Sequence, residues 1–212
     1  MDKPFRDIPF VVAIALITAA MASAQNPPRY TAADVRFMQG MIGHHGQALA
    51  MTALIPARTA RQDIRSLGQR IEVSQKDEIA MMKQWLTDRH QQVPANDAMH
   101  DHKAAADHPM NMHMPGMAMS DTLMPGMLTT EQLAELARTN GDAFDRLFLK
   151  DMIRHHEGAL VMVASLLGTT GSAQEAEVFR FASEVDSDQR AEIARMTALL
   201  DTLAPTGATT HR

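Results

Sequence analysis

Methionine and histidine side chains are unusually frequent in this chain. Its 212 residues include 18 methionines and 10 histidines, but no cysteine, one tryptophan and one tyrosine. A thioether is a soft, uncharged donor that suits Cu(I) or Ag(I), and imidazole can in addition hold Cu(II). The absence of cysteine excludes thiolate ligands and disulfides. The methionine and histidine side chains therefore favour a soft metal ion.

The densest group of such donors lies between residues 99 and 127, with eight methionines and four histidines. The candidate ligands there are Met99, His100, His102, His108, Met110, Met112, His113, Met114, Met117 and Met119, with Met124 and Met127 completing the group. Prolines and glycines within the stretch deny it a regular helix or strand, so we assign residues 91–128 to a flexible insert. A loose chain of this kind can wrap two or three donors around one ion. The alternatives are a methionine-rich docking surface for a partner protein or an accidental bias in composition.

Two pairs of adjacent histidines recur with the same neighbours. Residues three and four apart share a helix face, so Met41 lies beside His44 and His45, as Met152 lies beside the second pair. The candidate ligands of this part are Met38, Met41, His44, His45, Met51, Met152, His155, His156 and Met162. A competing interpretation makes His44 and His155 core imidazoles that hydrogen-bond across the fold to Gln75, Glu78, Gln189 or Glu192. In a mixed case, these four polar residues orient histidines that bind the metal.

The histidine pairs belong to two copies of one helical hairpin. Residues 34–51 and 145–162 are identical at nine of 18 aligned positions. In the first copy, Phe37, Met41, His44, Ala48 and Met51 follow the alternating four- and three-residue spacing of a core-facing helix seam. One hairpin cannot bury its apolar face alone, so two should pack together. We predict an all-α, antiparallel four-helix bundle, residues 31–203, built from hairpins at 31–90 and 129–203 with the methionine- and histidine-rich insert between them.

The predicted seams place charged and polar groups where apolar side chains are expected. His44 and His155 occupy seam positions, and so do Glu78 and Glu192 on the partner helices. Burying such groups without partners costs several kcal/mol. We expect them to pair with one another, to hold water or to bind a ligand.

The two ends of the chain are expected to lie outside the domain. Lys3 and Arg6 precede an apolar run, and Ala22-Ser23-Ala24 is a small-residue cleavage pattern, so residues 1–24 are predicted to be a secretory signal peptide cut after Ala24. The run is shorter than the roughly 20 residues that span a bilayer, and no stable membrane span is expected after cleavage, although an uncleaved anchor is the alternative. Residues 25–30 and 204–212 are expected to be disordered.

The net charge of −5 argues against nucleic acid as a partner.

The histidine segments resemble the domain-of-unknown-function 305 family. The resemblance is carried by residues 37–45 and 141–159, with Gln75, Glu78 and Met82 matching the family's second helix, and it extends over residues 31–203. It implies a ferritin-like four-helix bundle in an exported bacterial protein, and some members of the family are periplasmic copper-binding proteins. The motif positions it implies for the site are Met41, His44, His45, Met152, His155 and His156.

These observations lead to one expectation and two alternatives. We expect a periplasmic or secreted copper-binding protein, and not an enzyme, that sequesters copper or hands it to a partner protein, with Cu(I) preferred and Cu(II) or Ag(I) also accepted. One alternative is a ferritin-like metalloenzyme that oxidises a metal ion at a Glu/His site, although the Glu-x-x-His pairs of di-iron bundles do not occur in the sequence. The other is a methionine-rich docking module.

Overall fold

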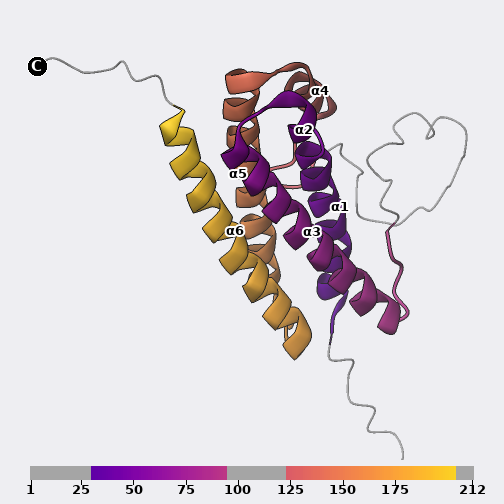
Figure 1. The fold of residues 1–212 in the computed structure, drawn as a ribbon. Coiled ribbons are helices and arrows are strands. Elements are labelled where there is room, and N and C mark those ends of the chain that lie inside the picture. Colours follow the sequence, from indigo (N-terminus) through magenta and orange to yellow (C-terminus); the bar gives the residue numbers. More distant parts are fainter. Residues whose placement is uncertain (1–29, 95–122, 204–212) are drawn as a thin grey trace, which may run out of the picture.

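The computed structural model describes residues 30–94 and 123–203, and all regular structure in these two ranges is helical (Figure 1). The helices are α1 (Ala32–Thr52), α2 (Ile55–Arg58), α3 (Gln62–Asp88), α4 (Thr130–Arg138), α5 (Gly141–Gly168) and α6 (Ala176–Thr202). The all-α class is confirmed.

Short polar motifs set where the helices begin. Thr31 and Asp34 form a capping box at α1, and Thr129 and Gln132 form another at α4, because each side chain satisfies a backbone N–H that the first turn leaves free. Ser172, which with Glu175 resembles a capping box for the last helix, does not cap it. Its hydroxyl contacts the carbonyls of Leu166 and Thr169 at the end of α5, and α6 begins at Ala176, with Glu175 as an N-cap that makes no side-chain hydrogen bond.

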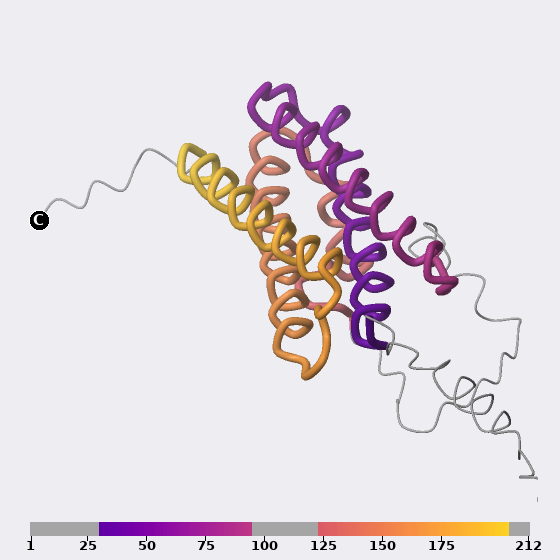
Figure 2. The backbone as a smooth tube through the Cα atoms, turned by 90° about the horizontal axis from the view of Figure 1, so that it is seen from below, coloured from indigo at the N-terminus to yellow at the C-terminus, as the bar shows by residue number. Residues whose placement is uncertain are grey.

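The long helices form two hairpins that meet through their first members. α1 packs against α3, α5 packs against α6, and α1 and α5 join the two hairpins along the middle of the molecule. Figures 1 and 2 show α1 and α3 on one side and α5 and α6 on the other. α3 and α6 meet at one end through side chains, where Trp85 and Arg89 donate hydrogen bonds to Glu175.

The apolar core has two parts with a polar layer between them. One part contains Phe37, Met41 and Met82, and the other contains Met51, Phe148 and Met152, among other buried residues. Each fully buried side chain of this size contributes about 1.5–3 kcal/mol through the hydrophobic effect. Buried histidines from the middle of α1 and α5 separate the two parts, and this layer is the polar feature that the seams predicted.

Two aspartates at equivalent positions of the two repeats, Asp34 and Asp145, each face the other hairpin. Oδ1 of Asp34 accepts a hydrogen bond of 2.7 Å from the amide of Ala173, in the loop between α5 and α6. Asp145 is fully buried, and its Oδ2 lies 3.9 Å from Nε of Arg61, just before α3. Burial raises the pKa of the Asp145 carboxyl, against the opposing effects of Thr59 and Arg61. Both aspartates therefore face the other hairpin, Asp34 through a hydrogen bond and Asp145 through the charge of Arg61.

Within the two described ranges, no helix is both long and apolar enough to span a membrane. The predicted signal peptide, residues 25–29 and the C-terminal tail lie outside these ranges, whereas Tyr30 packs edge-on against Trp85.

Candidate metal centre

Four buried imidazoles lie at the centre of the molecule, and we call His44, His45, His155 and His156 the histidine cluster. Each is at most 1% exposed. His44 on α1 and His155 on α5 face each other across the contact between the hairpins, with ring centroids 3.8 Å apart and planes inclined by 36°. The repeated histidine pairs therefore converge from the two hairpins on one place.

The second histidine of each pair contacts a glutamate of its own hairpin. Nε2 of His45 contacts Oε2 of Glu78 on α3, and Nε2 of His156 lies 2.6 Å from Oε2 of Glu192 on α6. The competing interpretation, in which these glutamates hydrogen-bond to His44 and His155, is therefore wrong. Because α1 and α5 each pack against two helices, they bury a second face in addition to the predicted seam.

The imidazoles that face each other are neutral near neutral pH. Burial, followed by the charge of His45, lowers the pKa of His44 to about 3, although the hydrogen bond to Pro125 acts in the opposite direction. Burial and the other three histidines lower the pKa of His155 well below its usual value. A neutral imidazole keeps one nitrogen lone pair free to bind a metal ion.

Every ring in the cluster has a buried nitrogen without a hydrogen-bond partner: Nδ1 in His44, His45 and His156, and Nε2 in His155. In His44, Nε2 donates 3.0 Å to the carbonyl of Pro125, so Nδ1 carries the lone pair. A carboxylate or carbonyl on one ring nitrogen, with the other nitrogen free, is the usual arrangement of a metal-binding histidine. Leaving a buried nitrogen unpaired costs about 1–3 kcal/mol, so the donor set fits a metal ion.

The described residues do not form a complete chelating site. Among them, no three histidine, aspartate or glutamate side chains are placed to hold one ion together. The rings offer donors singly or in pairs, and the remaining positions around an ion would need thioethers or a shift of side chains.

The predicted methionine ligands divide into three groups. Met38, Met41, Met51 and Met152 are at most 1% exposed and belong to the apolar core. Met162 is half-buried and packs at the edge of the core. The predicted ligands that lie outside the described residues are Met99, His100, His102, His108, Met110, Met112, His113, Met114, Met117 and Met119.

The four polar residues predicted to orient the histidines are all buried. Glu78 and Glu192 contact the cluster as described, while Gln75 and Gln189 lie about one turn before them. The side-chain carbonyl of Gln75 has no hydrogen-bond partner.

The last residues of the predicted flexible insert are held against the core, and we call residues 123–128 the strap. Gln47 exchanges two hydrogen bonds with the backbone of Leu128, of 2.9 and 2.7 Å. Gly126 has a φ of 77°, and the backbone there lies directly on Gly158, where an added Cβ would be 1.9 Å from the Pro125 carbonyl oxygen. The strap supplies the carbonyl that binds His44, a role that the sequence interpretation missed. Gly158 and Gln47 were its only signals.

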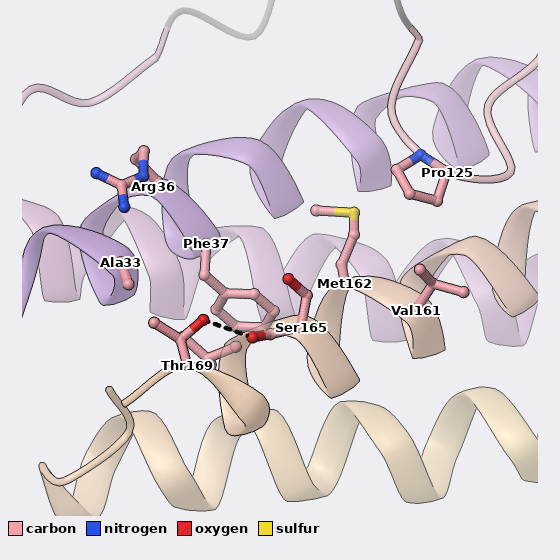
Figure 3. A pocket seen from close by; sticks show the side chains of 9 residues that line it. Ala33, Arg36, Phe37, Pro125, Val161, Met162, Ser165 and Thr169 are labelled. Carbon is pink, nitrogen blue, oxygen red and sulfur yellow. Dashed lines mark hydrogen bonds between the residues drawn. The ribbon is translucent and has the colours of Figure 1, made fainter. Parts of the chain in front are cut away.

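A solvent-facing hollow of about 330 Å³ adjoins the strap. Figure 3 shows its walls, with Arg36 and Phe37 from α1 on one side and Met162 rising from α5 toward Pro125. Pro125, whose carbonyl accepts the hydrogen bond of His44, lines this hollow.

The fold and the site describe a two-hairpin helical protein with a buried cluster of repeated histidines. The family model named "Domain of unknown function (DUF305)" matches residues 34–200, and the chain belongs to this family. No curated protein matches the chain significantly.

Solved structures of similar proteins support this assignment. A DUF305 fragment from Deinococcus radiodurans is 30% identical, with a TM-score of 0.64 over 83% of this chain and 99% of that one. A DUF305 protein from Streptomyces coelicolor, thought to be secreted, is 26% identical, with a TM-score of 0.63 over 81% and 93% of the two chains. CopM in its Cu(II)-bound form is 25% identical, with a TM-score of 0.58 over 80% and 96%.

Proposed function

We propose that this protein binds copper as cargo, holding it for sequestration or transfer without catalysing a reaction. The single observation that carries the proposal is the histidine cluster, in which four buried rings each keep a nitrogen without a partner. The same nitrogens in a protein with no metal to bind would only reduce its stability. The similarity to CopM, solved with Cu(II) bound, supports copper as the ion.

The proposal assigns two kinds of metal ligand to the chain, imidazoles and thioethers. The cluster supplies imidazoles, with Glu78 and Glu192 fixing the tautomers of His45 and His156, and imidazole suits Cu(II) as well as Cu(I). The methionine-rich insert supplies thioethers, which favour Cu(I) and also accept Ag(I). Capture by the insert and retention by the cluster would suit an exported protein of copper homeostasis or resistance that passes its ion to a partner protein.

Two further assignments belong to the proposal. The chain is exported, in the periplasm or outside the cell, on the strength of residues 1–24 and of the Streptomyces relative thought to be secreted. The two hairpins are a ferritin-like four-helix bundle, in agreement with the contacts of α1 with α3 and α5, and of α5 with α6.

Copper-dependent stability tests the cluster separately from the insert. An ion that binds only the folded core raises the free energy of unfolding by about 2.7 kcal/mol at 100 times its dissociation constant. An ion that binds equally well to the folded and the unfolded chain has no such effect. We expect Cu(I), supplied anaerobically with a competing chelator, to raise the urea midpoint of the wild type and of His90→Gln, whose histidine is exposed. The double variant His44→Gln/His155→Gln should lose the increase. An equal increase in all three proteins, or none in the wild type, contradicts the proposal.

A further inference from the structure

Two half-buried methionines lie together over a trough in α1. Met124 belongs to the strap and Met162 to α5, and both line the surface of Gly40. The position that a Cβ of Gly40 would occupy is 3.4 Å from Sδ of Met124 and 3.5 Å from Cε of Met162. Cε of Met124 lies 3.6 Å from the corresponding position of Gly43. Side chains from two segments 38 positions apart therefore bring two thioethers to one place.

The trough is a feature of only one repeat. The positions equivalent to Gly40 and Gly43 in α5 are Asp151 and Arg154. A glycine inside a helix costs about 1 kcal/mol relative to alanine, so α1 gives up stability where α5 does not. The space released by the two glycines is occupied by the thioether of Met124.

Packing of the strap does not by itself require Met124. The strap is already fastened by Gln47, by His44 and by the backbone contact at Gly158. Met124 instead sits one residue before the carbonyl that binds His44, and Met162 lines the hollow beside it (Figure 3). This pair of sulfur side chains therefore lies where the strap, which binds His44, borders the hollow.

The residues around the two thioethers favour an ion of low charge. Thioethers are neutral and soft, and Arg36 lines the same hollow. A nearby positive charge penalises a divalent cation about twice as much as a monovalent one. The combination favours Cu(I) or Ag(I) over Cu(II) or Zn²⁺.

We propose that Met124 and Met162 form a thioether site for a monovalent soft ion, at the strap with which the methionine-rich insert ends. Two thioethers can hold such an ion in near-linear coordination. Because two neutral ligands bind the ion weakly, the ion can move on to another site. The site deepens the proposed function and rests on it, because Met124 directly precedes Pro125, whose carbonyl accepts the hydrogen bond of His44 in the cluster that is to receive the ion.

The test follows methionine methyl groups by NMR while Ag(I), a redox-inert substitute for Cu(I), is titrated into the full chain to saturation. We expect the methyl signals of Met124 and Met162 to shift together. Met162→Leu should abolish the shift of Met124, and Met124→Leu that of Met162, because leucine keeps the volume and removes the sulfur. Met127→Leu, elsewhere on the strap, is the matched control and should leave both shifts unchanged.

Two outcomes overturn this site. One is that neither methyl signal moves at saturation, and the other is that each still moves in the absence of its partner. The double variant His44→Gln/His155→Gln separates this site from the cluster, since its Met124 and Met162 signals should still shift. If they remain still while Cu(I) raises the stability of the wild type, the thioether site is refuted and the proposed function stands.

Discussion

The two hairpins carry the same central residues but differ in what surrounds them. Both present a histidine pair, a glutamate that contacts the second histidine, and an aspartate that reaches the other hairpin. They differ beside the glutamates, where Ser74 donates a 3.1 Å hydrogen bond to Glu78, while the equivalent of Ser74 is Asp188. They differ also on the strap side, where Gly40 and Gly43 correspond to Asp151 and Arg154.

This comparison separates two kinds of requirement. The histidines that recur either face each other between the hairpins or contact a glutamate of their own hairpin, so both hairpins contribute equally to the histidine cluster. Residues that differ lie beside the glutamates, or at positions 40 and 43 of α1, against which Met124 of the strap packs. The strap thus breaks the symmetry of the centre, since it gives His44 a carbonyl partner and leaves Nε2 of His155 without one.

The largest expected effect tests what the hairpins share. The pKa of His44 is about 3 in the folded protein against 6.5 for an ordinary histidine, so between these values the unfolded chain binds a proton that the folded one does not. Stability is therefore complete above about pH 6.5 and falls as the pH decreases toward 3, by up to about 1.4 kcal/mol per pH unit for each such histidine. Urea unfolding at pH 7 and 4.5 should show this loss.

Single variants show whether the two hairpins contribute equally to the pH dependence. His44→Gln and His155→Gln should each reduce the slope of stability against pH by a similar amount. A slope that neither variant changes would mean that the buried rings are not its source.

The next largest effect concerns the strap, which lies on one face of the molecule. In Gly158→Ala, the new Cβ would lie 1.9 Å from the carbonyl oxygen of Pro125 and 2.7 Å from Cα of Gly126. Both neighbours are backbone, so the strap must move, and we expect a loss of about 3 kcal/mol. Gly46→Ala meets no atom within 4 Å and should instead gain about 1 kcal/mol from helix propensity. Chemical denaturation of both variants measures the difference, and equal stabilities would contradict the close contact.

The smallest effect exchanges the residues beside the glutamates. Ser74→Asp should destabilise the protein by about 0.5–1 kcal/mol, because it removes a hydrogen bond from Glu78 and adds a like charge four residues away. Asp188→Ser should stabilise it by a similar amount, since burial and then the charges of Glu78 and Glu192 raise the pKa of Asp188. The double exchange should be close to neutral in urea unfolding. Effects of one sign in both single variants would show that the two sites are not equivalent.

Helix positions and buried polar residues could be predicted from the sequence, but their pairing could not. The spacing through His44 and His155 identified buried seams, and the capping boxes at Thr31 and Thr129 located two helix starts. Periodicity describes one face of a helix, however, and α1 and α5 bury two faces because each packs between neighbours. His45 and His156, rather than the seam histidines, therefore reach the glutamates.

The strap could not be predicted because its contacts are made by the backbone. Proline and glycine in residues 123–128 indicate an irregular chain, which the sequence cannot distinguish from a mobile one. The fixed position depends on the approach of Gly126 to Gly158 and on the carbonyl of Pro125. Neither contact leaves a pattern in side-chain type or spacing.

The tie between Asp34 and Ala173 has a consequence for the order of synthesis. The two residues are 139 positions apart, so when the first hairpin leaves the ribosome its buried carboxylate lacks this amide donor. His44 likewise lacks Pro125 and His155 at that moment. The N-terminal half therefore stays incompletely folded until the C-terminal half has been made. The chain reaches its native state only after translation is nearly complete.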